Sequence, residues 1–281
     1  ANCTSLYSIS LSESLRAIYN GAFGNCSSLS YLIIPSLTSY IFSDAFGNCT
    51  RLRTVNIEGS LDKIYNFAFY QCTGLTEVSS PNGISYIGPY AFANCGSLAK
   101  FSAKSIYEID DNAFRSCTSL SNLSVTTNIP VIGAGAFYNC RFATMSGFNV
   151  SSIQDYTFAY CSRLTSITIP SEVTSIGKYA FSQCTRLTSI SISGNISLIG
   201  DYAFYQCTSL QSITIPKPVT TVGNYAFSLC TSLTNINIER SQTVFGDNTF
   251  AGCTMLRACT LPYTVISIGQ YMFANCNNLG A

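Results

Sequence analysis

Cysteine is the residue type in this chain with the most chemical potential, because thiolates act as nucleophiles and metal ligands and thiol pairs form disulfides. Thirteen of the fourteen cysteines recur in the same local context, almost always 23 residues apart, and the loosest interval runs from Cys140 to Cys161. A fixed period of this length indicates one supersecondary unit stacked on copies of itself. The thirteen are Cys3, Cys26, Cys49, Cys72, Cys95, Cys117, Cys140, Cys161, Cys184, Cys207, Cys230, Cys253 and Cys276.

Catalytic and metal chemistry has little support in the sequence. The chain contains no histidine, so Ser-His and Cys-His nucleophile arrangements cannot form within it. It also has no C-x-x-C pair that would indicate a zinc site. The densest acidic group, Glu108, Asp110 and Asp111, resembles part of a calcium loop, but a solvated turn explains it better. We therefore predict no enzyme activity, no cofactor and no metal site.

Free, buried thiols are the preferred interpretation of the cysteine column. Each cysteine follows a Phe-x-x pattern, which indicates an inward-facing apolar position. In-register side chains on stacked strands are about 4.8 Å apart, whereas a disulfide needs Cβ atoms about 3.8 Å apart. Cys259 lies outside the column, and it replaces a strand isoleucine at another predicted core position.

The elements of one coil are clearest between Cys184 and Cys207. Residues 188–192 alternate polar and apolar side chains, as in a half-buried strand. The spacing before the next cysteine predicts a helix of one turn. Acidic or amide residues lie six positions before several cysteines, and we expect them to cap this helix. These expected caps are Asp111, Asp155, Asp201, Asn224 and Asp247.

The pattern C-x-x-L-x-x-I-x-I-P-x-x-V-x-x-I-G-x-x-A-F resembles the BspA-like, or Treponema-type, leucine-rich repeat, and the resemblance covers essentially the whole chain. It implies an α/β repeat solenoid that is right-handed and curved, with one parallel sheet on its concave side and short helical turns on its convex side. Members of this family are commonly surface proteins, and several act as adhesins or recognition modules.

On this basis we expect a single solenoid over residues 1–281, with about 12 coils of 23 residues. The phenylalanines three residues before the cysteines should form one continuous buried column. They are Phe23, Phe46, Phe69, Phe92, Phe114, Phe137, Phe158, Phe181, Phe204, Phe227, Phe250 and Phe273. The short interval after Cys140, where Phe142, Met145 and Phe148 are out of phase, predicts an irregular coil with disturbed strand pairing.

Composition favours an extracellular or cell-surface location. Charged residues make up 10% of the chain, against about 25% in soluble domains. The net charge of +1 gives no field that would attract nucleic acid, and no apolar run approaches the about 20 residues of a membrane span. The two ends lie in the same phase of the repeat without polar capping coils. We therefore expect a segment of a longer protein, and end-to-end self-association is one candidate interaction.

Six Asn-x-Ser/Thr sequences have two interpretations. In a secreted eukaryotic protein they would be glycosylation acceptors. Alternatively, asparagine ends the expected short helix before the cysteine, and Asn94, Asn139 and Asn275 favour this view because they hold the same position without the motif. The six are Asn2, Asn25, Asn48, Asn122, Asn149 and Asn195.

The outward strand positions, five and seven residues after each cysteine, differ along the chain. In the C-terminal half they are small and polar, as in Ser166, Thr214 and Asn237. A glycan-binding array is the minor interpretation of these rows. The N-terminal half carries larger or charged groups, which are common anchors of protein interfaces. The predicted partner-binding residues are Tyr31, Ile33, Arg53, Thr54, Glu77 and Lys100.

Two functional hypotheses follow. The first is a non-catalytic recognition or adhesion module that binds a protein, such as a host matrix component or receptor, through the concave face. The second is a structural spacer or building block of a surface layer or filament.

Overall fold

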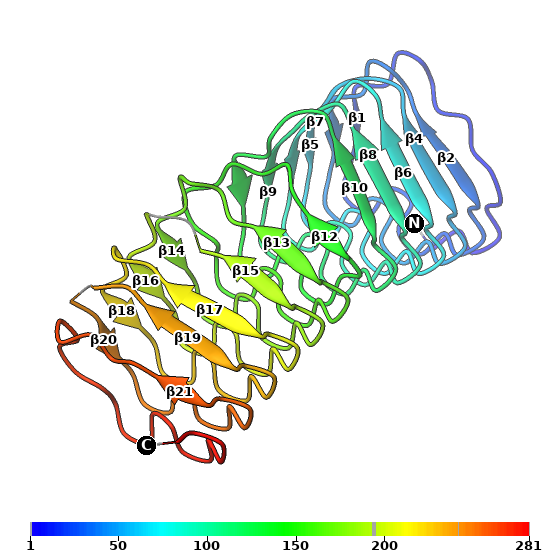
Figure 1. Ribbon diagram of the computed structural model, residues 1–281. Coiled ribbons are helices and arrows are strands. Elements are labelled where there is room, and N and C mark those ends of the chain that lie inside the picture. Colours follow the sequence, from blue (N-terminus) through cyan, green and yellow to red (C-terminus); the bar gives the residue numbers. More distant parts are fainter. Residues whose placement is uncertain (1, 193–194, 241, 281) are drawn as a thin grey trace. The chain divides into compact units, whose positions relative to one another are not determined.

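The computed structural model describes residues 2–192, 195–240 and 242–280, and all regular structure in this part of the chain is β-strand (Figure 1). The residues group into two compact units, Ala1–Arg141 and Phe142–Ala281. Each unit is a stack of coils whose strands pair in parallel with the equivalent strands of neighbouring coils. A single solenoid over residues 1–281 stays a prediction.

Unit 1 contains two parallel sheets, one from each strand of its coils. The first sheet consists of β2 (Tyr31–Ile34), β4 (Thr54–Ile57), β6 (Glu77–Ser80), β8 (Lys100–Ala103) and β10 (Asn122–Val125). The second sheet consists of β1 (Ala17–Ile18), β3 (Tyr40–Ile41), β5 (Leu61–Ile64), β7 (Ile84–Ile87), β9 (Ile106–Ile109) and β11 (Val131–Ile132).

Unit 2 follows a similar plan with mostly shorter strands, except that the strands that follow its cysteines form two sheets of three strands and not one continuous sheet. The strands that follow the cysteines are β12 (Thr144–Met145), β13 (Ser166–Thr168), β15 (Ser189–Ser191), β17 (Ser212–Ile215), β19 (Asn235–Ile238) and β21 (Ala258–Cys259). The second strands are β14 (Ser175–Ile176), β16 (Leu198–Ile199), β18 (Thr221–Val222) and β20 (Val244–Phe245).

The predicted parallel-sheet solenoid is confirmed within each unit, but the prediction of a single parallel sheet was wrong, because most coils have a second strand. In β7, Ile84 and Ile87 are buried while the two residues between them face outward. This spacing breaks the strict alternation by which strands are recognised in a sequence. The described residues form about ten coils, fewer than the twelve predicted; for example, residues 8–11 after Cys3 form no strand.

The predicted one-turn helices were also wrong. In the coil before Cys49, Asp44 and Asn48 have φ values of 54° and 59°, and residues in this left-handed region cannot continue a right-handed helix. Hydrogen bonds alternate instead between the coil itself and its neighbour. Ala45 N–H donates to Phe42 O at 3.2 Å, and Phe46 N–H donates to Ala68 O of the next coil at 2.8 Å. This segment is thus a second ladder between coils.

The expected helix caps bond to the next coil. Asp155 Oδ1 accepts the N–H of Lys178 at 2.7 Å, and Asp201 Oδ1 accepts the N–H of Asn224 at 2.9 Å. Asp111, Asn224 and Asp247 accept equivalent bonds. A glycine precedes each residue whose N–H donates, and it lets the two coils approach this closely. A Cβ on Gly177, for example, would lie 2.5 Å from Asp155 Oδ1. These glycines are therefore required by the close packing of neighbouring coils.

The phenylalanine prediction is confirmed within each unit, where the rings form stacked columns. In unit 1 the rings from Phe23 to Phe137 stack with centroids 5.0–5.8 Å apart. In unit 2 those from Phe158 to Phe273 do the same at 5.0–5.8 Å. Ten of the twelve are buried, and only Phe23 and Phe273 are partly exposed.

The irregular coil after Cys140 is confirmed. One sheet ends at β10, and the next sheet begins at β12, which has only two residues. Phe142, Met145 and Phe148 are all buried there in place of the regular leucine and isoleucine pattern. The first compact unit ends at this point, at Arg141.

Candidate interaction surfaces and the family of the chain

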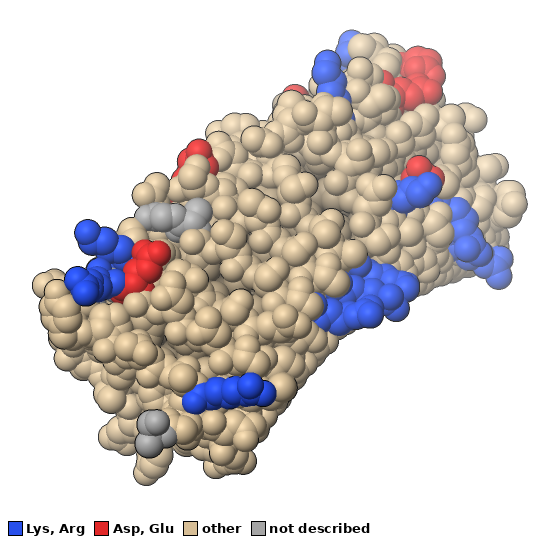
Figure 2. Space-filling model, viewed as in Figure 1, with Lys and Arg blue, Asp and Glu red and all other residues tan. Residues whose placement is uncertain are grey.

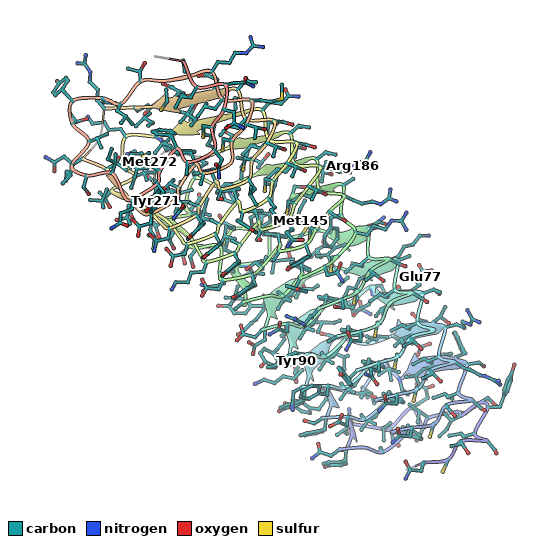
Figure 3. All side chains as sticks on the ribbon, turned by 90° about the horizontal axis from the view of Figure 1, so that it is seen from below. Glu77, Tyr90, Met145, Arg186, Tyr271 and Met272 are labelled. Carbon is teal, nitrogen blue, oxygen red and sulfur yellow. The ribbon has the colours of Figure 1, made fainter. Side chains whose placement is uncertain are left out.

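The structure places four of the six predicted partner-binding residues in one row. Tyr31 pairs in register with Thr54, Thr54 with Glu77, and Glu77 with Lys100. Adjacent parallel strands are about 4.8 Å apart, so the row crosses β2, β4, β6 and β8 without a break. We call the outward surface of these strands and β10 the β2–β10 face; Glu77 points away from the ribbon in Figure 3.

The β2–β10 face exposes large side chains at its β2 end. Tyr31 and Ile33 are 48% and 37% exposed, whereas Leu32 and Ile34 are buried, as the alternation predicted. Ile33 begins a second row, in which its neighbour is Asn56. An exposed tyrosine beside an exposed isoleucine is an apolar anchor of the type that carries binding energy at protein interfaces.

The charged members of this row form no ion pair with another described residue. Glu77 and Lys100 lie opposite each other in register, yet the one ion pair among the described residues joins Lys178 and Asp201 at 3.5 Å. Charged side chains are sparse on the visible face of the molecule (Figure 2). Both groups are exposed and so remain available to a partner.

Arg53 and Thr54 have different surroundings. Thr54 is half-buried within the row, between the larger Tyr31 and Glu77. Arg53 is exposed just before β4, and its carbonyl accepts the N–H and the hydroxyl of Thr76 at 2.8 and 2.9 Å. The backbone of Arg53 is thereby fixed, and its side chain reaches solvent.

A groove of about 330 Å³ adjoins Tyr31 and Ile33. The other residues that line it come from the segment before β1 and from the two turns that follow β2 and β4. They are Ser8, Ile9, Ser10, Leu11, Glu13, Pro35 and Glu58. Sequence reasoning missed this groove because it expected residues 8–11 to form a strand level with β2.

The equivalent surface of unit 2 is neutral. Ser212 pairs with Asn235 and Thr214 with Asn237 across β17 and β19. These side chains line a groove of about 530 Å³ that contains no ionisable residue. The contrast between the two halves, predicted from the outward strand positions, is confirmed for these residues.

The second sheet of unit 1 carries polar contacts that sequence reasoning missed. Tyr40, Lys63, Tyr86 and Glu108 form a row in register. The Lys63 ammonium lies 5.2 Å from the centroid of the Tyr86 ring, and the Tyr86 hydroxyl donates to Asp110 Oδ2 at 2.5 Å. Burial and this carboxylate raise the pKa of Tyr86. The sequence pattern that could have revealed this row is the pair of outward residues that lies between the two buried apolar residues of β5, β7 and β9.

No disulfide joins the cysteines in the described part of the chain, in agreement with the preferred interpretation from the sequence. Ten of the column thiols donate to the carbonyl of the phenylalanine in the preceding coil, for example Cys207 Sγ to Phe181 O at 3.2 Å. Burial raises the pKa of the Cys230 thiol to about 12. Two positions differ from the prediction, since Cys3 is exposed and Cys259 is only partly buried. Each lies in a coil at one end of the chain, with fewer neighbours to cover it.

The asparagines before the cysteines are explained by backbone conformation. Asn25, Asn48 and Asn94 have φ values of 59°, 59° and 61°, and asparagine is one of the few residues that adopt this region readily. The Asn25 amide also donates to Asn2 Oδ1 of the neighbouring coil at 3.0 Å. This supports a structural origin for these sequences; whether they carry glycans stays a prediction.

Among residues 2–192, 195–240 and 242–280, no three His, Cys, Asp or Glu residues are placed to hold a metal ion. The same ranges contain no helix that is long and apolar enough to cross a membrane.

Comparisons with known proteins identify the repeat. The fold is similar to a leucine-rich repeat protein from Bacteroides ovatus ATCC 8483, with a TM-score of 0.52 and 24% identity over 89% of this chain and 83% of that one. It is also similar to one from Eubacterium ventriosum ATCC 27560, with a TM-score of 0.51 and 15% identity over 96% of this chain and 82% of that one. A search of curated proteins found no significant match.

At the sequence level, the family described as "BspA type Leucine rich repeat region (6 copies)" matches residues 1–106, 39–164, 101–197 and 151–280. These overlapping matches cover essentially the whole chain. They agree with the stacked coils, the buried cysteine column and the paired phenylalanine columns. The chain belongs to the family of BspA-type leucine-rich repeat proteins.

Proposed function

We propose that this chain is a non-catalytic recognition or adhesion module that acts outside the cell or on its surface. It binds a protein, such as a host matrix component or receptor, through the β2–β10 face. The observation that carries this proposal is the row of Tyr31, Glu77 and Lys100, which is in register, exposed and without internal ion pairs.

The rigidity of the face supports this role. The strands that carry the row are bonded to neighbours on both sides from β4 to β8, and their inward side chains are buried. Side chains held on such a scaffold lose little backbone entropy on binding, which raises affinity for a given contact area. Anchors of the tyrosine type typically contribute about 2 kcal/mol or more when they are centrally placed.

Surface plasmon resonance against a panel of purified matrix proteins and receptor ectodomains tests the proposal. We expect at least one saturable interaction that the double variant Glu77→Ala/Lys100→Ala weakens at least tenfold. The matched control is Ser212→Ala/Asn235→Ala, which changes the corresponding row of unit 2 and should leave binding unchanged. Equal effects of the two variants would contradict the proposed face.

The second candidate function is a structural spacer or filament unit, and one observation favours it. Ile268 is 53% exposed, whereas Val222, at the equivalent position of an inner coil, is fully buried. Exposed apolar groups of this kind suit stacking against further coils. Sedimentation velocity tests this function: reversible, concentration-dependent assembly that Ile268→Asp abolishes would support it, and a monomer at all concentrations would contradict it.

A further inference from the structure

The groove beside Tyr31 is formed by a segment that is attached to the rest of the unit at both ends. The N–H of Ser30 donates to Tyr7 O at 3.2 Å, and that of Ser39 donates to Arg16 O at 2.9 Å. Between these attachments, residues 8–14 make no backbone hydrogen bond to β2. The segment therefore stands off the sheet edge, and the groove lies between it and the exposed side chains of β2.

Part of the groove wall is apolar, and Ser8 and Ser10 line the groove beside it. Ile9 and Leu11 contribute from the segment, and Tyr31, Ile33 and Pro35 contribute from β2 and the residue after it. Ile9 and Leu11 occupy positions that are buried in inner coils, yet here they are partly exposed. The groove thus offers an apolar surface on which a side chain of a partner can be removed from water.

The charge in the groove is negative and uncompensated. Glu13 and Glu58 are the ionisable residues in its lining, and no lysine or arginine contributes to it. Neither carboxylate takes part in an ion pair. The Glu58 carbonyl accepts the Asn82 amide, so the turn that carries this carboxylate is held in place. Both glutamates are exposed, and a cation in the groove would meet two carboxylates at the protein surface, where the effective dielectric constant is lower than in bulk water and the attraction is correspondingly stronger.

We propose that this groove binds a segment of the partner protein in which an apolar side chain is followed by lysine or arginine. The apolar side chain contacts Ile9, Leu11 and Ile33, and the cation lies between Glu13 and Glu58. The volume of about 330 Å³ is at the lower limit of ligand pockets, about 300–1,000 Å³, and so suits one or two side chains. This inference rests on the proposed function and specifies the chemistry of its partner.

Methyl-labelled protein tests the groove directly by NMR, with acetyl-Leu-Arg-amide as the probe and acetyl-Leu-Glu-amide as its charge-reversed counterpart. We expect the Ile9 and Ile33 methyl signals to shift saturably with the arginine peptide, with an apparent Kd at least fivefold lower than that of the glutamate peptide. The Ile236 methyl, in the unit 2 groove, should not move. No shift at Ile9 and Ile33, or equal shifts with both peptides, would overturn the inference.

Substitution of Glu13 and Glu58 tests whether their carboxylates bind the cation of the peptide. Glu13→Gln/Glu58→Gln should remove the preference for the arginine peptide and leave the thermal unfolding temperature unchanged, because neither group makes an internal ion pair. Glu172→Gln, an exposed acid of unit 2, is the matched control and should retain the preference. Retention of the preference in the double variant would contradict the assignment.

The outcomes separate this inference from the proposed function. If a partner protein is found whose binding needs Glu77 and Lys100, but neither peptide shifts Ile9 or Ile33, the groove is wrong and the β2–β10 face stands. If the arginine peptide binds selectively but no protein on the panel does, the groove stands and the proposed function is wrong.

Discussion

Truncation of Phe204 to alanine removes a ring from the centre of the unit 2 column. The side chain is fully buried and stacks on Phe181 at 5.3 Å and on Phe227 at 5.0 Å. Phe→Ala substitutions at such sites cost about 3–5 kcal/mol, because transfer energy is lost and a cavity remains. Each aromatic pair is worth about 0.5–1.5 kcal/mol beyond its buried area.

These terms overlap, so we expect a loss of about 4 kcal/mol in the free energy of unfolding. Urea denaturation followed by circular dichroism measures this loss. Gln211→Ala, an exposed position of the same unit, is the control and should stay within about 0.5 kcal/mol of the parent. A loss below about 2 kcal/mol for Phe204→Ala would mean that the column does not carry the stability of the coils.

Three further predictions concern the contacts between coils. Gly223→Ala places a Cβ 2.5 Å from the Asp201 backbone nitrogen and should destabilise by about 1–3 kcal/mol in urea denaturation, whereas Gly96→Ala, where the nearest atom is 3.6 Å away, should be nearly neutral. Gln206 has a φ of 58°, so Gln206→Val should lower the thermal unfolding temperature while Gln206→Asn should not, and equal effects would contradict the conformational argument. Because the folded-state pKa of Cys230 lies above its unfolded value, its contribution to stability is complete below about pH 9 and is lost as the pH rises towards about 12; Ellman's reagent at pH 8 should accordingly modify buried column thiols such as Cys207 and Cys230 only after unfolding, whereas the exposed Cys3 should react in the folded protein.

The core of each coil was predictable because its signals are repeated and local. The repeat register identified Tyr31 and Ile33, five and seven residues after Cys26, as the outward side chains of the strand Tyr31–Ile34. The recurring phenylalanines identified the buried columns, since a position that is apolar in every copy must face the shared interior. The unreactive state of thiols such as Cys207 followed from the same inward phase and from strand spacing.

The second sheet and the turns were mispredicted for two different physical reasons. In β7, two outward residues separate Ile84 from Ile87, so the strand has neither of the periods that identify regular elements. Before the cysteines, the spacing of Ala, Phe and Cys is near-helical, but left-handed residues such as Tyr202, with a φ of 56°, direct backbone donors to the next coil. Tyrosine is rarely found in this conformation, so composition gave no indication of it.

The candidate site was predictable as a row and not as a groove. Positions five and seven after a cysteine gave Tyr31 and Ile33, and strand register then aligned Thr54, Glu77 and Lys100. The groove depends on residues 8–14 leaving the sheet, and the repeat pattern predicts a strand there. Sequence periodicity describes the average coil, so it cannot indicate where one coil departs from the others.

The most direct test of the proposed face compares Tyr31→Ala with Thr214→Ala in the same binding assay. Both residues are exposed on equivalent strands, one beside the groove of unit 1 and one on the neutral row of unit 2. We predict that Tyr31→Ala weakens binding to the partner protein at least tenfold with a nearly unchanged unfolding temperature, and that Thr214→Ala has little effect. Equal losses, or a greater loss with Thr214→Ala, would contradict recognition through the β2–β10 face.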